Sequence, residues 1–220
     1  MAITFGTVTT GQNTGASPLT YSYTVDSNTT CLIVTTSYGG SGDDVSGVTW
    51  DGNSLTKVVV SSSNAHASFW RLTNPTPSTG NVVVTKSGST DRGTISNAIN
   101  VFGGSTATPI GDTSNAAVAS GTSVSSSIDT TETGSVSLIL ATKRPNGGNS
   151  IAVGGSQVAI SNIDQAGTAS GCRAGFSYLD TPLFATNYSV SYTGGSGDEW
   201  GLVAVELVPS SALNTYTGTP

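Results

Sequence analysis

The sequence predicts an all-β fold, an antiparallel β-sandwich of the jelly-roll type, from two observations. Apolar residues alternate with Ser and Thr over several short runs, and clusters of Gly, Asn and Pro separate these runs at short intervals. An alternation with a period of two turns one face of a strand to a core and the other to water, and Gly and Asn supply the positive φ angles of tight hairpins. We count about a dozen candidate strands and no credible helix.

The clearest strand candidates are spread along the whole chain and are rich in β-branched and hydroxyl side chains, which favour the pleated surface over the helix. In chain order they are residues 3–8, 19–25, 30–34, 58–60, 82–84, 136–140, 151–153, 188–192 and 203–205. Because all-β sandwiches of this length are commonly undivided, we expect one domain over residues 1–209. Residues 210–220 show no alternation and are expected to form an extended C-terminal tail.

The composition excludes several classes of function. The 220 residues carry a formal net charge of −6, only 9% are charged, and Ser and Thr make up roughly a third of the chain. Seven Lys and Arg cannot form the basic surface that a nucleic acid needs, so we expect no nucleic-acid partner. No apolar run approaches the ~18 residues of a membrane span, so we expect no membrane partner. The start of the chain shows no secretory signal, which predicts synthesis in the cytoplasm.

The residues that usually carry catalysis are few and scattered. His66 is the single histidine and lies in a run of small alternating residues, which indicates a structural role rather than that of a general base. No Gly-x-Ser-x-Gly motif and no phosphate-binding loop occurs, and most acidic residues fall in turns, where carboxylates are solvated or cap backbone amides. We therefore expect a protein that is not an enzyme and has no catalytic residues.

The two cysteines allow two interpretations. Cys31 lies in an apolar, strand-like run, where a cysteine is usually a small buried hydrophobe. The alternative is a disulfide between Cys31 and Cys172, which a cytoplasmic site of synthesis disfavours. With one histidine, neither cysteine can complete a zinc site.

Two acidic segments resemble each other and suggest a metal site. Residues 38–44 and 192–199 share the order Tyr, Gly, Gly, Ser, Gly and acid. If both are loops at one end of the sandwich, they would bring together a set of hard oxygen ligands for Ca²⁺, namely Asp43, Asp44, Asp198 and Glu199. The other interpretation is two separate, solvated acidic loops. Beyond this possible calcium site we expect no cofactor.

The aromatic residues also allow two interpretations. Tyr38 and Trp50 are candidates for a sugar-stacking platform, since Trp50 precedes a tight turn where its ring could be exposed. Each tryptophan nevertheless lies in or beside a strand, where a buried indole commonly fills the core.

The strand edges point to an assembly. Natural sheets often protect their edges with inward lysines or strand prolines, whereas this chain has only three lysines and its prolines cluster in turns. We therefore expect a homo-oligomer or a larger assembly in which other chains cover the edges. The partner-binding candidates are Ile3, Phe5 and Val8 of the N-terminal strand and Leu213 and Tyr216 of the tail.

Several segments together resemble a known type of domain. They are Val48–Val58 (VTWDGNSLTKV), Phe69–Pro75 (FWRLTNP), Val101–Gly104 (VFGG) and Glu199–Leu207 (EWGLVAVEL). Their order resembles the jelly-roll-like β-sandwich domain of phage structural proteins, associated with capsid decoration or with tails, and of some bacterial surface proteins. The resemblance implies display, capsid decoration or attachment and brings no catalytic residues with it.

Taken with the single compact domain, the resemblance implies a capsid decoration (cement) protein. Such a protein would lie on the virion surface, bind the major capsid protein or other virion subunits, and stabilise the shell. The alternative is an attachment, receptor-binding or carbohydrate-binding module of a tail fibre or surface adhesin.

Overall fold

The fold was analysed in a computed structural model. It describes residues 1–14, 17–40, 44–61, 65–87, 93–144, 151–164, 171–180 and 186–210. All regular structure in these segments is β-strand, and every strand pairing is antiparallel. Within these segments no helix has the length and apolar character needed to cross a membrane. The predicted all-β, antiparallel fold is confirmed.

The strands form three sheets. The central sheet has the order β1-β10-β4-β8-β7, with β2 also paired to β10; the C-terminal sheet has the order β11-β16-β12-β15-β14, with β13 also paired to β16; and the outer sheet has the order β3-β9-β5-β6. The strand bounds are β1 Thr4–Phe5, β2 Thr9–Asn13, β3 Leu19–Val25, β4 Thr29–Tyr38, β5 Val45–Trp50, β6 Asn53–Ser54, β7 Thr56–Val60, β8 His66–Thr73, β9 Ser78–Lys86, β10 Thr94–Phe102, β11 Ile110–Ile128, β12 Val136–Arg144, β13 Ala152–Val153, β14 Val158–Asp164, β15 Arg173–Asp180 and β16 Tyr188–Leu207.

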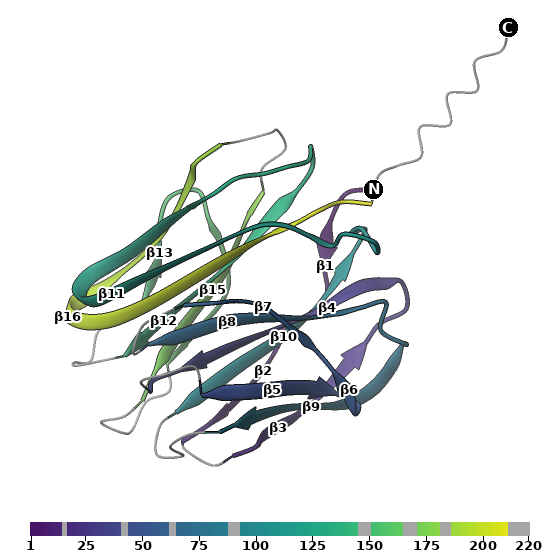
Figure 1. The fold of residues 1–220 in the computed structure, drawn as a ribbon, viewed down its shortest axis with the longest axis horizontal. Coiled ribbons are helices and arrows are strands. Elements are labelled where there is room, and N and C mark those ends of the chain that lie inside the picture. Colours follow the sequence, from purple (N-terminus) through teal and green to yellow (C-terminus); the bar gives the residue numbers. More distant parts are fainter. Residues whose placement is uncertain are drawn as a thin grey trace, which may run out of the picture.

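The three sheets stack on one another because the central strands are apolar on both faces. In β4, Cys31 and Ile33 face the C-terminal sheet, whereas Leu32 and Val34 face the outer sheet. This is the alternation expected of a strand with a core on each side. Figure 1 shows β3, β9 and β5 at the bottom, β4 and β10 above them, and β13 higher still.

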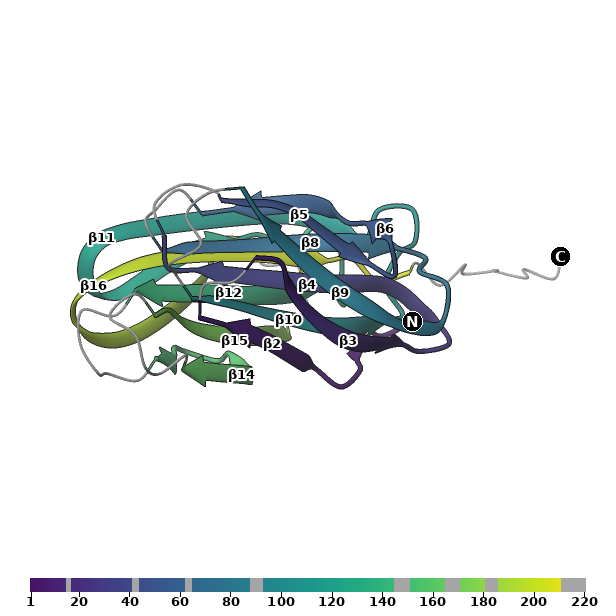
Figure 2. The same cartoon turned by 90° about the horizontal axis from the view of Figure 1, so that it is seen from below.

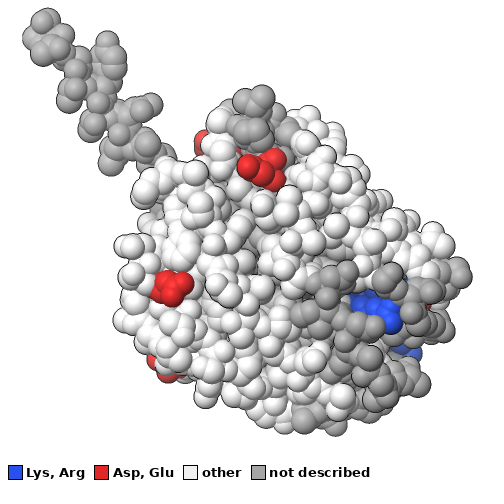
Figure 3. Space-filling model, turned by 180° about the vertical axis from the view of Figure 1, so that it is seen from behind, with Lys and Arg blue, Asp and Glu red and all other residues white. Residues whose placement is uncertain are grey.

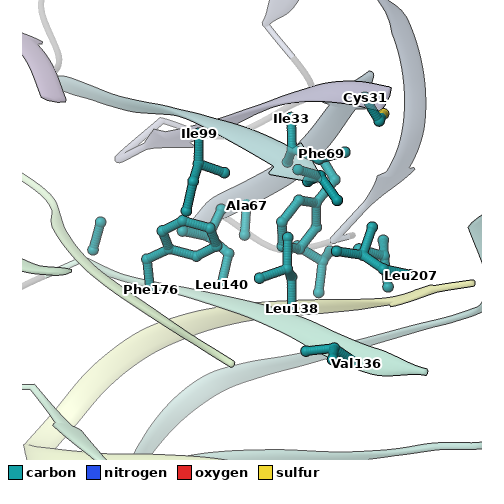
Figure 4. Close-up of a cluster of buried hydrophobic side chains, with 14 of the residues drawn as sticks. Cys31, Ile33, Ala67, Phe69, Ile99, Val136, Leu138, Leu140, Phe176 and Leu207 are labelled. Carbon is teal, nitrogen blue, oxygen red and sulfur yellow. The ribbon is translucent and has the colours of Figure 1, made fainter. Parts of the chain in front are cut away.

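The core between the central and C-terminal sheets is the largest of the three. Figure 4 shows Phe69 of β8 and Phe176 of β15 among aliphatic side chains from both sheets. The two rings lie 6.2 Å apart between centroids with a 56° tilt, an edge-to-face arrangement that adds to the apolar burial. This core makes the two sheets a β-sandwich.

The two longest strands, β11 and β16, run together as a ribbon that folds back over the C-terminal sheet. The two halves of β11 contact each other, since Asn115 O accepts a hydrogen bond from the Ser126 hydroxyl at 3.5 Å. Just beyond the end of the strand, Asp129 N donates a hydrogen bond to Asp112 Oδ2 at 2.9 Å. The bend lies at Gly121, whose carbonyl accepts a hydrogen bond from Trp200 Nε1 at 3.1 Å. Figure 2 shows this bend at the end of the molecule opposite the N-terminus.

The folded ribbon creates a third apolar core. Val124 and Ile128 of β11 and Val190 and Tyr192 of β16 pack on the face of the C-terminal sheet that is turned away from the central sheet. Tyr192 donates a hydrogen bond from its hydroxyl to Ser177 Oγ at 2.7 Å. The sandwich therefore has two more layers than the two sheets that the sequence predicted: the outer sheet on one side and the ribbon on the other.

Candidate functional site: a groove at the open edge of the sandwich

The sandwich is open on one side, where the edge strands of its two sheets lie beside each other. Of the strands in the described segments, β14 pairs only with β15 and β1 only with β10. Between these edges lies a hollow of about 440 Å³ whose floor includes Ile3, Ile99 and Val136. We call this hollow, together with the one that adjoins it, the edge groove.

The second hollow of the edge groove lies toward the two chain ends and has a volume of about 660 Å³. It shares Ile3, Val136 and Asp180 with the first hollow, so the two are neighbours. The N-terminal amino group of Met1 donates a hydrogen bond to Ser210 O at 3.0 Å, which holds the two ends of the described chain together at this place.

An aromatic pair bridges the two sheets at the groove. Phe5 of β1 and Tyr178 of β15 have ring centroids 5.5 Å apart with a tilt of 56°. Both rings are half-buried, so each offers part of its apolar surface to a ligand or partner. The two rings form part of the apolar wall of the first hollow.

The charged side chains at the groove are acidic. Glu132 lines the larger hollow, and Asp180 lines both hollows; both residues are exposed. The positive group nearby is the amino terminus of Met1. Figure 3 shows one face of the molecule, on which the few charged side chains lie apart among uncharged residues. Two acidic side chains at one groove therefore differ from the rest of this sparsely charged surface.

A buried carboxylate fixes the wall of the larger hollow. Glu206 of β16 is fully buried and accepts hydrogen bonds from the backbone amides of Asp112, Thr131 and Glu132 at 2.9, 2.6 and 3.4 Å. Its carboxylate also accepts a bond from the Thr131 hydroxyl at 2.9 Å. This carboxylate therefore has a structural role and positions the segment that carries Glu132.

The N-terminal partner-binding candidates lie in their own chain's sandwich. Ile3 is a member of the core, and Phe5 and Val8 pack against that core while half-buried. Residues 4 and 5 form a strand, β1, that pairs with β10 of the same chain, so they do not extend as a free arm in this structure. Ile3 and Phe5 instead line the edge groove. Leu213 and Tyr216, the candidates in the tail, lie outside the described residues.

The predicted calcium ligands do not form a cluster of loops. Asp198 and Glu199 lie inside β16, not in a loop, and successive residues of a strand point to opposite faces. Asp198 contacts Lys143 Nζ at 2.5 Å and Glu199 contacts Arg144 Nη1 at 2.9 Å. Asp44 is half-buried, and Asp43 lies outside the described residues. In the segments that the structure describes, no three Asp, Glu, His or Cys side chains gather as a metal site would require.

The predicted glycan-stacking residues are core residues. Tyr38 and Trp50 are 0% and 1% exposed, so neither ring can stack on a sugar. Trp50 packs between the outer and central sheets and donates a hydrogen bond from Nε1 to Tyr23 O at 3.3 Å. Its turn at Asp51 and Gly52 carries the chain back without exposing the indole. The interpretation of these aromatics as core fillers holds, and the platform is wrong.

Both cysteines are buried free thiols, so the interpretation as small buried hydrophobes holds. The Cys172 thiol contacts Ser37 O at the far end of β4 from Cys31. Six residues of strand separate Cys31 from Ser37, or about 20 Å at ~3.3 Å per residue, far beyond the reach of a disulfide. Burial raises the pKa of the Cys31 thiol to about 12, and nearby Arg71 opposes this only in part.

The sequence analysis missed the groove residues of β14 and β15. A signal was present, since Ala174, Phe176 and Tyr178 occupy alternate positions of Arg173–Asp180, with Gly175 and Ser177 between them. This alternation predicts a strand, but nothing in it indicates that the strand lies next to β14 at an open edge.

The sequence was compared with protein families and with curated proteins, and neither comparison found a match.

Proposed function

We propose that the protein is a non-enzymatic structural protein of a virus particle, a capsid decoration protein that binds the outside of the shell through the edge groove. The observation that carries this proposal is the groove itself, with an apolar floor between two sheet edges and acids at its rim. The resemblance of the chain to phage structural domains supports the same function.

The groove suits an extended segment of a capsid subunit. Such a segment adds hydrogen bonds to the outer edge of β14 and buries its apolar side chains against Phe5 and Tyr178. A Lys or Arg in the segment pairs with Glu132 or Asp180 at the rim. Stable contacts bury about 1,200 Å² or more in total, so the groove is the centre of a larger interface.

The rest of the molecule is rigid, as a capsid decoration protein requires. Three apolar cores fix four layers of strands, and the buried Glu206 holds the segment at the groove wall in place. A partner therefore meets a surface whose shape is set before binding, which lowers the entropy lost on association.

The test uses virus particles purified from a host culture in which this chain is produced. We expect the chain to co-sediment with the major capsid protein in many copies per particle. Particles stripped of the chain should take up added wild-type protein but bind Ala159→Arg at least tenfold more weakly, because residue 159 is exposed and lines the groove.

Ser156→Arg is the matched control, since residue 156 is exposed, precedes β14 and does not line the groove. It should bind like wild type. Absence of the chain from particles refutes the proposed function, and its location on tails alone supports the attachment module instead. Wild-type binding by Ala159→Arg refutes the role of the groove.

A further inference from the structure

A lysine and an aspartate contact each other in the interior of the C-terminal sheet. Lys143 Nζ, near the end of β12, lies 2.5 Å from Asp198 Oδ2 at the bend of β16, and the two side chains are 0% and 1% exposed. Ammonium–carboxylate hydrogen bonds are commonly about 2.7–2.9 Å long, so this contact is unusually close.

The surroundings of the pair exclude water. The Trp200 ring lies with its centroid 5.5 Å from Lys143 Nζ, and its own Nε1 is bonded to Gly121 O at the bend of β11. Asp198 is in register with Gly121, so the folded ribbon closes over the pair. Trp200 is itself fully buried.

The next residue of each strand gives a direct comparison. Arg144 and Glu199 also form an ion pair, at 2.9 Å, but their side chains are 26% and 20% exposed. Because neighbouring residues of a strand face opposite ways, one pair lies in the core and the other reaches solvent. Solvent therefore reaches the outer pair, whereas the inner pair is almost completely shielded from it.

From this geometry we propose that Lys143 and Asp198 condense to an intramolecular amide bond that joins β12 to β16. A proton first passes from Lys143 Nζ to the Asp198 carboxylate, which leaves an amine and a carboxylic acid with no charge in the dry interior. The Nζ lone pair then attacks Cγ, and an Nζ–Cγ bond forms. A proton moves from Nζ to one hydroxyl of the tetrahedral intermediate, the Cγ–O bond breaks and one water leaves.

The fold supplies what this reaction needs. Two groups held in contact react as if at very high concentration, because folding has already brought them together and the reaction itself loses little entropy. Attack requires the neutral amine, and lysine, unlike arginine, can supply it. The reaction consumes no oxidant or co-reactant, and it yields one amide and one water. The bond closes a ring that contains β13, β14 and β15, and it is independent of the proposed function.

The test is the intact mass of the full-length protein, purified and then denatured. We expect a mass about 18 Da below that of the unmodified chain, allowing for removal of Met1. After trypsin digestion, fragmentation should show one joined peptide pair linked between residues 143 and 198. An unmodified mass, or a loss of water located at another residue, overturns the proposal.

Substitutions distinguish the amide from a salt bridge. Asp198→Asn removes the carboxylate that takes the proton from Lys143 Nζ, so it should form no amide and keep its full mass. Lys143→Arg should keep its full mass. Glu199→Gln, in the solvent-exposed neighbouring pair, is the matched control and should retain the 143–198 link. If either variant still loses water or ammonia between residues 143 and 198, the proposal fails, and the wild-type mass decides it even if neither variant folds.

Discussion

The three lysines of the chain all place their side-chain nitrogens over aromatic rings. Lys57 lies 4.7 Å from the centroid of Trp70, Lys86 lies 5.1 Å from that of Tyr38, and Lys143 lies 5.5 Å from that of Trp200. Such contacts are favourable, more so away from water. Lys57 also donates a hydrogen bond to Val45 O at 3.0 Å. The sequence analysis considered the lysines as residues that protect sheet edges. In the structure each of them instead packs against an aromatic ring.

Glu206 gives a prediction about a single buried carboxylate. Glu206→Gln keeps the shape but removes the charge and one acceptor oxygen from a site with four donors. We expect the free energy of unfolding in urea to fall by about 2 kcal/mol, since hydrogen bonds to charged groups are the stronger ones. Glu132→Gln, at an exposed position, is the control and should change it by less than about 0.5 kcal/mol. Equal effects of the two substitutions would contradict the structural role of Glu206.

Cys31 gives a prediction about pH. Burial raises the pKa of its thiol to about 12, so at pH 8 the folded protein holds the unreactive thiol rather than the thiolate. Iodoacetamide should leave both cysteines unlabelled in the folded protein and label both in urea. Since the folded state binds this proton more tightly than the unfolded state, stability should decline as the pH rises above about 9. Rapid labelling of Cys31 in the native protein at pH 8 would show that it is not buried as described.

At the scale of the strand, local pattern predicts the strands with one apolar face and misses the folded ribbon. The alternation of Leu19–Val25 is visible in the sequence, and β3 has those bounds. In contrast, Gly194 and Gly195 suggest a turn between two strands, yet β16 continues through them to Leu207. It continues because β11 bends beside it, and this pairing between distant segments leaves no local signal.

Gly175 gives a prediction at this scale, because the ribbon packs on it. A Cβ at residue 175 would lie 2.4 Å from Tyr192 Cε1, and this ring cannot easily move while its hydroxyl is bonded to Ser177. We expect Gly175→Ala to cost about 1–3 kcal/mol of unfolding free energy, as overpacked cores do. Gly47→Ala in β5 is the matched control, since a Cβ there meets nothing within 4 Å. If both substitutions are neutral in urea denaturation, the ribbon does not pack on β15 as described.

At the scale of the whole molecule, a sequence pattern predicts sheets but not how many of them stack. The strands β4, β10 and β12 are buried almost continuously, because each is covered on both faces by other strands. A continuously apolar run such as Cys31–Val34 indicates a strand buried on both faces, but it does not indicate which two sheets cover it. The edge groove has the same origin. It is formed by β1, β12, β14 and β15 meeting at the open side, so its residues could not be predicted from any one segment.

The proposed amide bond has a consequence for the stability of the whole chain. A link between residues 143 and 198 closes a ring of about 55 residues, and the loop-entropy relation for cross-links gives a stabilisation of about 4 kcal/mol. Lys143→Arg and Asp198→Asn, which cannot form the link, should therefore both unfold at a lower guanidinium concentration than wild type.

Loss of a buried ion pair alone would also lower stability, so the slope of the transition distinguishes the two explanations. The linked chain stays more compact when unfolded and exposes less surface, so wild type should have a smaller denaturant m-value than Lys143→Arg. If the two m-values are equal, the unfolded wild-type chain carries no ring, and the pair stabilises β12 and β16 only as a salt bridge. A larger m-value than wild type in both Lys143→Arg and Asp198→Asn requires a covalent connection in wild type, because it is the unfolded state that differs.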